Sequence, residues 1–209
     1  MSRARVQVSH RRFPLGRRRA ARKAEVFTRE YEFPSHISRR VRRRYPDLDD
    51  PGWKLAERGL REWFICCAWR GRAVLGMPSR VVDEAWHEFL LDSIAYITFC
   101  DVAFGAYLHH TPDEAMATPS ADLLYNTVRA WDRSDAGANA ESVLWDLDEQ
   151  LGIPEPLGVS GLQLSAARSG VPGAGGAAGA PGACGTGGSD GGSADGGGCG
   201  GGGCGGGGS

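Results

Sequence analysis

The chain has 209 residues, of which 41% are hydrophobic and 23% charged, and its formal net charge at pH 7 is -1. This total hides an asymmetry: residues 1–44 hold 15 Lys and Arg against three Glu, a balance of +12 that leaves -13 for the rest. No apolar run approaches the roughly 20 residues of a membrane-spanning helix, and the basic start lacks the apolar core and cleavage site of a secretory signal. The sequence therefore predicts a cytoplasmic protein, and its preference for Arg, Ala and Gly favours a bacterial source.

Composition divides the chain into three parts. Residues 170–209 contain 22 glycines and no side chain larger than Val or Asp, so this segment cannot build a core. We expect a disordered basic arm over residues 1–30, a helical domain over residues 31–157 and a disordered Gly/Cys-rich tail over residues 158–209. The six cysteines do not indicate a disulfide framework, because thiols stay reduced in a cytosolic chain.

The first two predicted helices have clear boundaries. One begins near Ser35, carries Ile37 and Val41 at helical spacing, and ends at Tyr45 because a proline follows. The next begins at Asp50, which caps a helix with proline in its first turn. Its apolar stripe comprises Trp53, Ala56, Leu60, Trp63, Phe64, Cys67 and Ala68.

The third and fourth predicted helices form a hairpin. Ser79 caps the third, and Asp92 or Ser93 caps the fourth, which ends near Gly105. Their apolar positions are Val82, Trp86, Phe89 and Leu90 on the third and Ile94, Tyr96, Ile97, Phe99 and Cys100 on the fourth.

Further helix starts are predicted at residues 111–114 and 120–122, the second opening a helix over residues 123–131. A last helix is predicted over residues 140–151, where Gly152 follows it. No useful stretch alternates with the period of two that strands show. The predicted fold class is therefore all-α, a small helical bundle with a basic arm and a Gly/Cys-rich tail.

The candidate site consists of the titratable side chains on and after the predicted hairpin. They are Asp83, His87, Cys100, His109 and His110. Asp83 and His87 are four residues apart, so a helix places them on one face, where the carboxylate can accept the imidazole N–H. If the two helices pack as a hairpin, Cys100 can face His87. Such a set of Asp, His and Cys ligands suits zinc or a similar borderline metal.

Two other interpretations of these residues stay open. In the structural one, a buried Asp83–His87 pair locks two helices, and His109 and His110 bond the last carbonyls of the fourth helix. In the catalytic one, Cys100 is the nucleophile and His87 is the base that Asp83 orients. The spacing His-x12-Cys-x8-His-His matches no zinc module that we can defend, and no P-loop or HExxH motif is present.

The same stretch carries a specific set of aromatic, histidine and small residues. They are Pro78, Ser79, Val82, Asp83, Trp86, His87, Leu90, Tyr96, Phe99, Cys100, Phe104, Gly105, His109, His110 and Pro112. In this pattern the chain resembles the glycine-rich domain-containing protein-like family over residues 31–119, and the tail fits that family's layout. The family is largely uncharacterised, with plant members linked to stress responses and development, so the resemblance implies no particular reaction.

The flanks indicate interaction rather than chemistry. The basic arm can release counterions from nucleic-acid phosphates or lie on an anionic bilayer, so we expect weak binding to such surfaces. In the tail, flexible glycines separate Cys184, Cys199 and Cys204, which favours a solvated linker over a metal site. We predict a helical binding or interaction module rather than an enzyme. The alternative is a metal-binding protein, or a metal- or thiol-dependent enzyme, that uses His87, Cys100 and His109 or His110.

Overall fold

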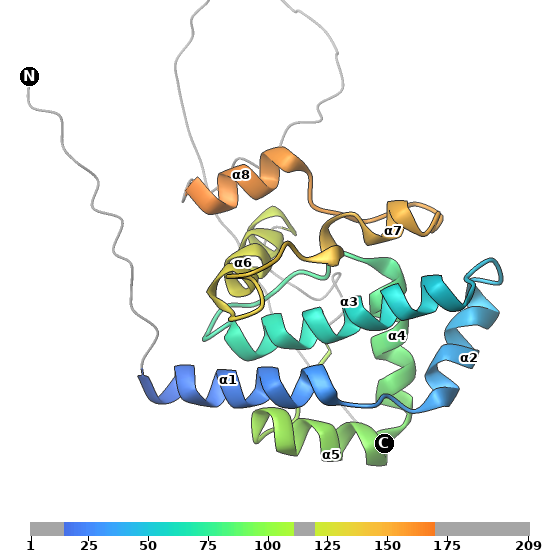
Figure 1. Ribbon diagram of the computed structural model, residues 1–209, viewed down its shortest axis with the longest axis horizontal. Helices are drawn as coiled ribbons and strands as arrows, with labels where there is room; N and C mark the ends of the chain where they lie inside the picture. The colour runs from blue at the N-terminus through green and yellow to red at the C-terminus, as the bar shows by residue number, and fades with distance from the viewer. Residues whose placement is uncertain (1–14, 111–119, 170–209) are drawn as a thin grey trace, which may run out of the picture. The chain divides into compact units, whose positions relative to one another are not determined.

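The computed structural model describes residues 15–110 and 120–169 of the chain (Figure 1). All regular secondary structure within these two ranges is helical, which confirms the all-α prediction. None of the helices there is long and apolar enough to cross a bilayer. The elements are α1 (Leu15–Glu30), α2 (Ser35–Arg44), α3 (Asp50–Trp69), α4 (Arg80–Leu91), α5 (Ser93–Phe104), α6 (Ser120–Arg133), the 3-10 turn η2 (Val143–Trp145), α7 (Leu147–Gln150) and α8 (Gly161–Ser169).

The two helices of the predicted hairpin, α4 and α5, begin and end at their sequence signals. The Ser79 hydroxyl accepts the N–H of Val82 at the start of α4. The Asp92 carboxylate accepts the N–H of Ala95 at the start of α5. Helix α5 ends at Gly105, whose φ of 67° is a left-handed conformation that glycine adopts without strain. These capping residues fix where the turn between α4 and α5 lies.

Two other predicted helix starts fall close to the observed ones. The cap of α3 is Asp49 rather than Asp50, and its carboxylate accepts the N–H of Gly52 at 2.7 Å. Helix α6 begins at Ser120, as predicted. The start predicted at residues 111–114 lies outside the described residues.

Helix α3 is the central element of the described fold, since α1, α4, α6 and η2 all pack against it (Figure 1). Its close approach to α4 and α7 depends on Gly59. A Cβ atom at this position would come within 2.7 Å of the Leu147 side chain and 2.9 Å of the Val82 side chain. A side chain larger than hydrogen would therefore force the buried Leu147 and Val82 side chains to move.

An aromatic cluster fixes α4 and α5 against α3. The Phe64 and Phe99 ring centroids lie 4.7 Å apart, and the Phe89 ring meets Phe99 edge-on at 5.5 Å. These three side chains are fully buried, and Tyr31, which follows α1, packs on Phe99 at 4.8 Å. Aromatic pairs of this geometry add about 0.5 to 1.5 kcal/mol beyond the burial of their area. Buried aromatic packing thus holds α4 and α5, the helix pair that carries the candidate site, against α3.

The prediction of a disordered arm is wrong for residues 15–30, which form α1 and pack against α3 and α5. The buried face of α1 consists of Ala21, Ala24, Glu25 and Thr28. Small and polar side chains on this face give no apolar stripe, so the arginines that surround them dominated the sequence pattern. Residues 1–14 lie outside the described residues.

Two predictions near the end of the described chain also need correction. Residues 161–169, expected in the disordered tail, form α8, which packs on α6 and buries Ala167. The helix predicted over residues 140–151 is broken. The Ser142 hydroxyl accepts the N–H of Leu144 and starts η2, and α7 follows as a separate short helix. The break lies at Asp146, whose φ of −137° and ψ of 15° are not helical, so the apolar spacing alone did not show where the helix is interrupted.

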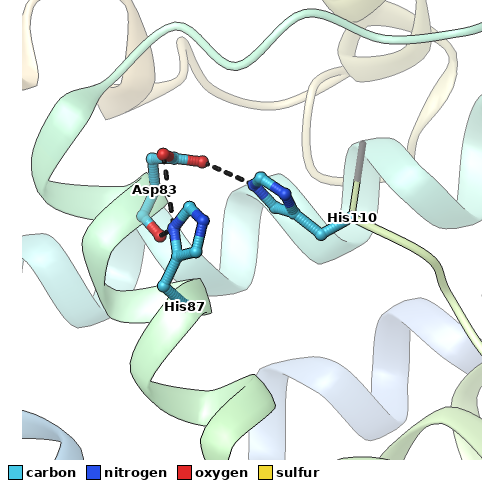
Figure 2. A group of neighbouring side chains, drawn as sticks. All are labelled: Asp83, His87 and His110. Atoms are coloured by element: carbon cyan, nitrogen blue, oxygen red, sulfur yellow. Dashed lines mark hydrogen bonds and ion pairs between the residues drawn. The ribbon is translucent and has the colours of Figure 1, made fainter. Parts of the chain in front are cut away.

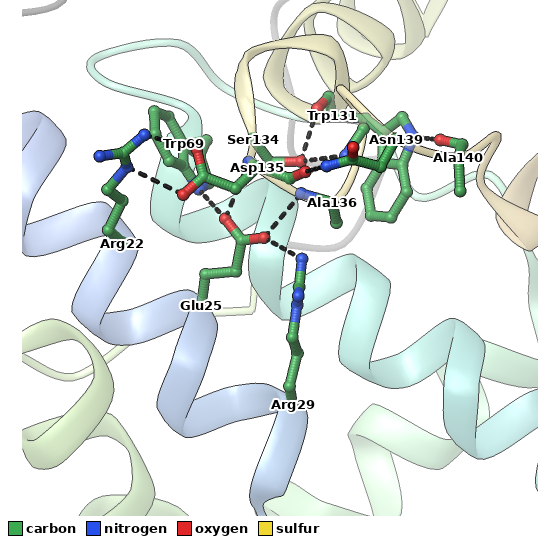
Figure 3. Close-up of polar contacts among 11 residues, drawn as sticks. Arg22, Glu25, Arg29, Trp69, Trp131, Ser134, Asp135, Ala136, Asn139 and Ala140 are labelled. Atoms are coloured by element: carbon green, nitrogen blue, oxygen red, sulfur yellow. Dashed lines mark hydrogen bonds and ion pairs between the residues drawn. The ribbon is translucent and has the colours of Figure 1, made fainter.

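A buried carboxylate ties α1 to the turn that follows α6 (Figure 3). Glu25 accepts the indole N–H of Trp69 at 2.8 Å and the backbone N–H groups of Asp135 at 3.1 Å and Ala136 at 2.7 Å. Arg29, one helical turn further on, pairs with the same carboxylate. Glu25 is thus the acceptor that joins three separate segments of the described fold.

Replacing Glu25 with Ala should lower the free energy of unfolding by about 2 to 4 kcal/mol, because three N–H donors lose a charged acceptor. Glu30 is exposed at the end of the same helix, so Glu30→Ala should change it by no more than about 0.5 kcal/mol. Urea unfolding followed by circular dichroism measures both variants. Equal stability of the two variants would contradict the docking of α1 through Glu25.

Candidate metal centre

An open cleft of about 1070 Å³ lies between α2, the loop after α3, the start of α4 and the segment after α5. Clefts that bind small molecules have volumes of roughly 300 to 1,000 Å³, so this one is large enough for such a ligand. Its walls combine basic, aromatic and histidine side chains. Among them are Arg43, Arg44, Tyr45, Arg70, Arg72, Arg80, Asp83, Glu84, Trp86, His87, Tyr107, His109, His110 and Glu155.

Asp83 and His87 lie on one face of α4, as their spacing predicts. The Nδ1 atom of His87 lies 2.8 Å from the backbone carbonyl of Asp83 and 3.4 Å from its carboxylate. Because a carbonyl can only accept, Nδ1 must carry the proton, and a neutral ring then has its lone pair on Nε2. The pair is not buried, since 35% of the Asp83 side chain and 47% of the His87 side chain are exposed. The predicted buried lock between two helices is therefore not what this pair forms.

His110 reaches the same carboxylate from the segment after α5. Its Nε2 atom donates to Asp83 at 3.0 Å. Its ring packs against Trp86 at 4.5 Å and against His87 at 4.2 Å between centroids. Figure 2 shows the two imidazole rings turned toward the Asp83 carboxylate. Only 14% of the His110 side chain is exposed, so its position is set by packing.

A chain of hydrogen bonds places the backbone just before His110. The indole N–H of Trp86 donates to the hydroxyl of Tyr96 at 3.1 Å, and this hydroxyl donates to the carbonyl of Leu108 at 2.6 Å. Trp86 and Tyr96 are both buried, and Leu108 is 4% exposed. The segment that carries His110 is thus attached to α4 and α5 through interior groups.

Asp83, His87 and His110 form a group that can hold a metal ion, because one ligand atom from each lies within 4.8 Å of the others. Zinc bonds of about 2.0 to 2.1 Å place two tetrahedral ligands about 3.3 Å apart. The Asp83 oxygens lie 3.0 Å from Nε2 of His110 and 3.4 Å from Nδ1 of His87, which is close to this value. A zinc ion there would displace the proton that each of these nitrogens now directs at Asp83 to the other nitrogen of its ring or to solvent. One carboxylate and two imidazoles are ligands that zinc accepts.

The structure does not bring Cys100 into this group. Its side chain is fully buried in α5 beside Tyr96. Burial raises the pKa of the Cys100 thiol, so it stays protonated at neutral pH, whereas a catalytic cysteine needs a thiolate. Burial raises the pKa of the neighbouring Cys67 thiol as well, to about 12. The interpretation of Cys100 as a nucleophile served by His87 therefore has no geometric support in the described residues.

His109 also lies outside the group, although it lines the same cleft. Its side chain is exposed, and its ring packs against Tyr107 at 4.8 Å. Adjacent residues in an extended segment point to different sides. His110 turns toward α4 and His109 does not, and sequence alone offered no signal for choosing between them.

The sequence profile of the UCP032817-like family matches residues 22–155. The chain belongs to this family. The resemblance to the glycine-rich domain-containing protein-like family is therefore wrong, and the histidine and aromatic residues quoted for it are part of a UCP032817-like chain. The match runs from α1 to just past α7, so it includes all three residues of the candidate metal centre. No curated protein and no solved structure matches the chain.

Replacing His87 with Ala should cost less than about 1 kcal/mol in the metal-free protein, because half-exposed side chains contribute little to stability. Trp86→Ala, at the neighbouring position, should cost about 3 to 5 kcal/mol, since it removes a buried ring and the donor to Tyr96. Chemical unfolding in the presence of a chelator measures both. A large loss in His87→Ala under these conditions would show that the imidazole is part of the core.

Proposed function

We propose that this chain is a metal-binding protein that holds zinc, or a similar divalent cation, between Asp83, His87 and His110. The observation that carries the proposal is that three side chains able to bind a metal, one carboxylate and two imidazoles, meet from two separate segments, α4 and the chain after α5. A purely structural role would need only the hydrogen bond from His110 to Asp83. It would leave unexplained why the His87 ring lies 4.2 Å from the His110 ring at the edge of an open cleft.

Three protein ligands leave a coordination position that faces the cleft. Structural zinc sites are closed by four protein ligands, whereas sites that bind water or a ligand keep one position open. The proposed role is therefore a binding module whose cation contacts a ligand in the cleft. The expected location is the cytoplasm, where the buried thiols of Cys66, Cys67 and Cys100 would stay reduced.

The basic arm supports a second, weaker interaction. Helix α1 has exposed arginines, and the sequence of residues 1–14 adds further positive charge. Binding of nucleic acid or an anionic surface through this part of the chain remains a proposal, and it would fall steeply with salt.

Purified protein should bind one zinc ion, and His110→Ala or Asp83→Ala should weaken zinc binding at least tenfold, since even the loss of a residue that only hydrogen-bonds to a metal ligand costs about 10- to 100-fold. Competition with a chromophoric chelator measures the affinity. The background should carry Ser at positions 184, 199 and 204, so that tail thiols contribute no zinc.

Two matched controls separate this site from the alternatives. His109→Ala removes an imidazole from the same cleft, and Cys100→Ser removes the thiol while nearly keeping its shape; both should keep wild-type affinity. If His109→Ala weakens zinc binding as much as His110→Ala does, the proposed ligand group is wrong. If none of these variants changes the affinity for zinc, Asp83, His87 and His110 do not form a metal centre.

A further inference from the structure

The cleft beside the candidate metal centre has an excess of positive charge. Five arginines line it, from α2, from the loop after α3 and from the start of α4. They are Arg43, Arg44, Arg70, Arg72 and Arg80. Only three carboxylates, those of Asp83, Glu84 and Glu155, line it with them. The formal balance is therefore +2 without a cation and +4 with a divalent one.

Part of this charge has no protein partner. Arg44 and Arg80 each pair with a carboxylate of the cleft, at 3.7 and 3.5 Å. In the described part of the chain no ion pair is formed by the remaining three, which are Arg43, Arg70 and Arg72. Arg70 and Arg72 lie two residues apart in the loop after α3 and line the cleft together.

This charge pattern selects the kind of ligand. The arginines of the cleft repel a divalent cation, so an anion with more than one unit of charge strengthens the binding of the cation more than a singly charged one. A phosphate monoester is close to doubly charged at neutral pH. Its oxygens accept the two parallel N–H bonds that a guanidinium offers, and one oxygen can fill an open coordination position. A single carboxylate carries half that charge.

We propose that the cleft binds a small phosphorylated molecule whose phosphate lies between Arg70, Arg72 and the cation at Asp83. The role of the cation in this inference rests on the proposed function. The volume of about 1070 Å³ suits a small molecule rather than a polymer. Tyr45 and Tyr107, which also line the cleft, give the organic part of the ligand aromatic surface to pack on.

The cation and the phosphate should each raise the affinity of the protein for the other. They have opposite charges and meet at one point, and reciprocal coupling follows from thermodynamic linkage. This coupling makes the inference testable apart from the metal centre itself.

Phenyl phosphate is a suitable probe, and benzoate is the carboxylate control. Titration calorimetry should show that zinc-loaded protein binds phenyl phosphate at least about tenfold more tightly than benzoate. The double variant Arg70→Gln with Arg72→Gln should bind phenyl phosphate at least about tenfold more weakly than wild type does. In the absence of phosphate the double variant should bind zinc at least as tightly as wild type, because two positive charges have been removed from the cleft. Arg39→Gln, an exposed arginine of α2 outside the cleft lining, is the matched control and should bind like wild type.

The outcomes separate the two proposals. Zinc binding without phenyl phosphate binding overturns the inference and leaves the metal centre standing. Equal affinity for benzoate, or an unchanged affinity in the double arginine variant, also overturns it. If the wild-type protein binds no zinc, the proposed metal centre is wrong. In that case, phenyl phosphate that still binds and depends on Arg70 and Arg72 supports the arginine part of the inference.

One further binding experiment tests a different class of ligand. A single-stranded oligonucleotide carries the same phosphates but in a polymer. If it binds the zinc-loaded protein more tightly than phenyl phosphate and loses that binding in the double arginine variant, the cleft is a nucleic-acid site and the small-molecule inference is wrong. If Arg70→Gln with Arg72→Gln leaves oligonucleotide binding unchanged, the cleft is not its site, as the inference requires.

Discussion

The candidate metal centre depends on one buried carboxylate, that of Asp148. It is fully buried and accepts four hydrogen bonds. The donors are the hydroxyl of Ser79 and the backbone N–H groups of Arg80, Val81 and Leu157. The first N–H groups of a helix have no partner inside it, and a negative charge at this end is favoured by the helix dipole. Asp148 therefore fixes the start of α4, and with it the positions of Asp83, about one turn further on, and of His87, about two turns further on.

Two other acids repeat this arrangement in the described fold. Glu25 accepts backbone N–H groups from the turn after α6, and Glu62 accepts the hydroxyl of Ser142 and the N–H of Val143. Each of the three acids thus joins a helix to the segment between α6 and α8. In the described residues this segment has only the short elements η2 and α7. Glu25 of α1 and Glu62 of α3 satisfy backbone N–H groups in that segment that have no helical partner, whereas Asp148 lies in the segment itself and mainly satisfies the first N–H groups of α4. Removing any one leaves its donors unpaired in the interior.

The features that were predicted correctly from the sequence are those that depend on residues close together in the chain. The capped starts of α4 and α5, the left-handed glycine after α5 and the shared face of Asp83 and His87 all depend on residues within a few positions of each other. What was missed depends on partners far away. Glu25 meets Ala136 across 111 positions, so nothing near Glu25 marks α1 as a docked helix rather than a basic arm. The expectation for Cys100 failed differently, because α5 is apolar on all sides and periodicity could not show which side faces the core.

The choice between His109 and His110 shows how a distant constraint creates a site. His110 lies 27 positions from Asp83, and what turns it inward is the attachment of Leu108 to the hydroxyl of Tyr96. Because Trp86 donates to the same hydroxyl and also packs on the His110 ring, one buried aromatic residue positions both sides of the ligand group. Ligands held in place before the ion arrives lose little freedom on binding it, so more of the intrinsic affinity remains. The cleft that contains Asp83 is also lined by five arginines, and their positive charge weakens the binding of a cation that arrives alone. In our proposal, an anion bound by the arginines would offset this charge and strengthen the binding of the cation, so that the metal centre and the arginines of the cleft would act as one binding site.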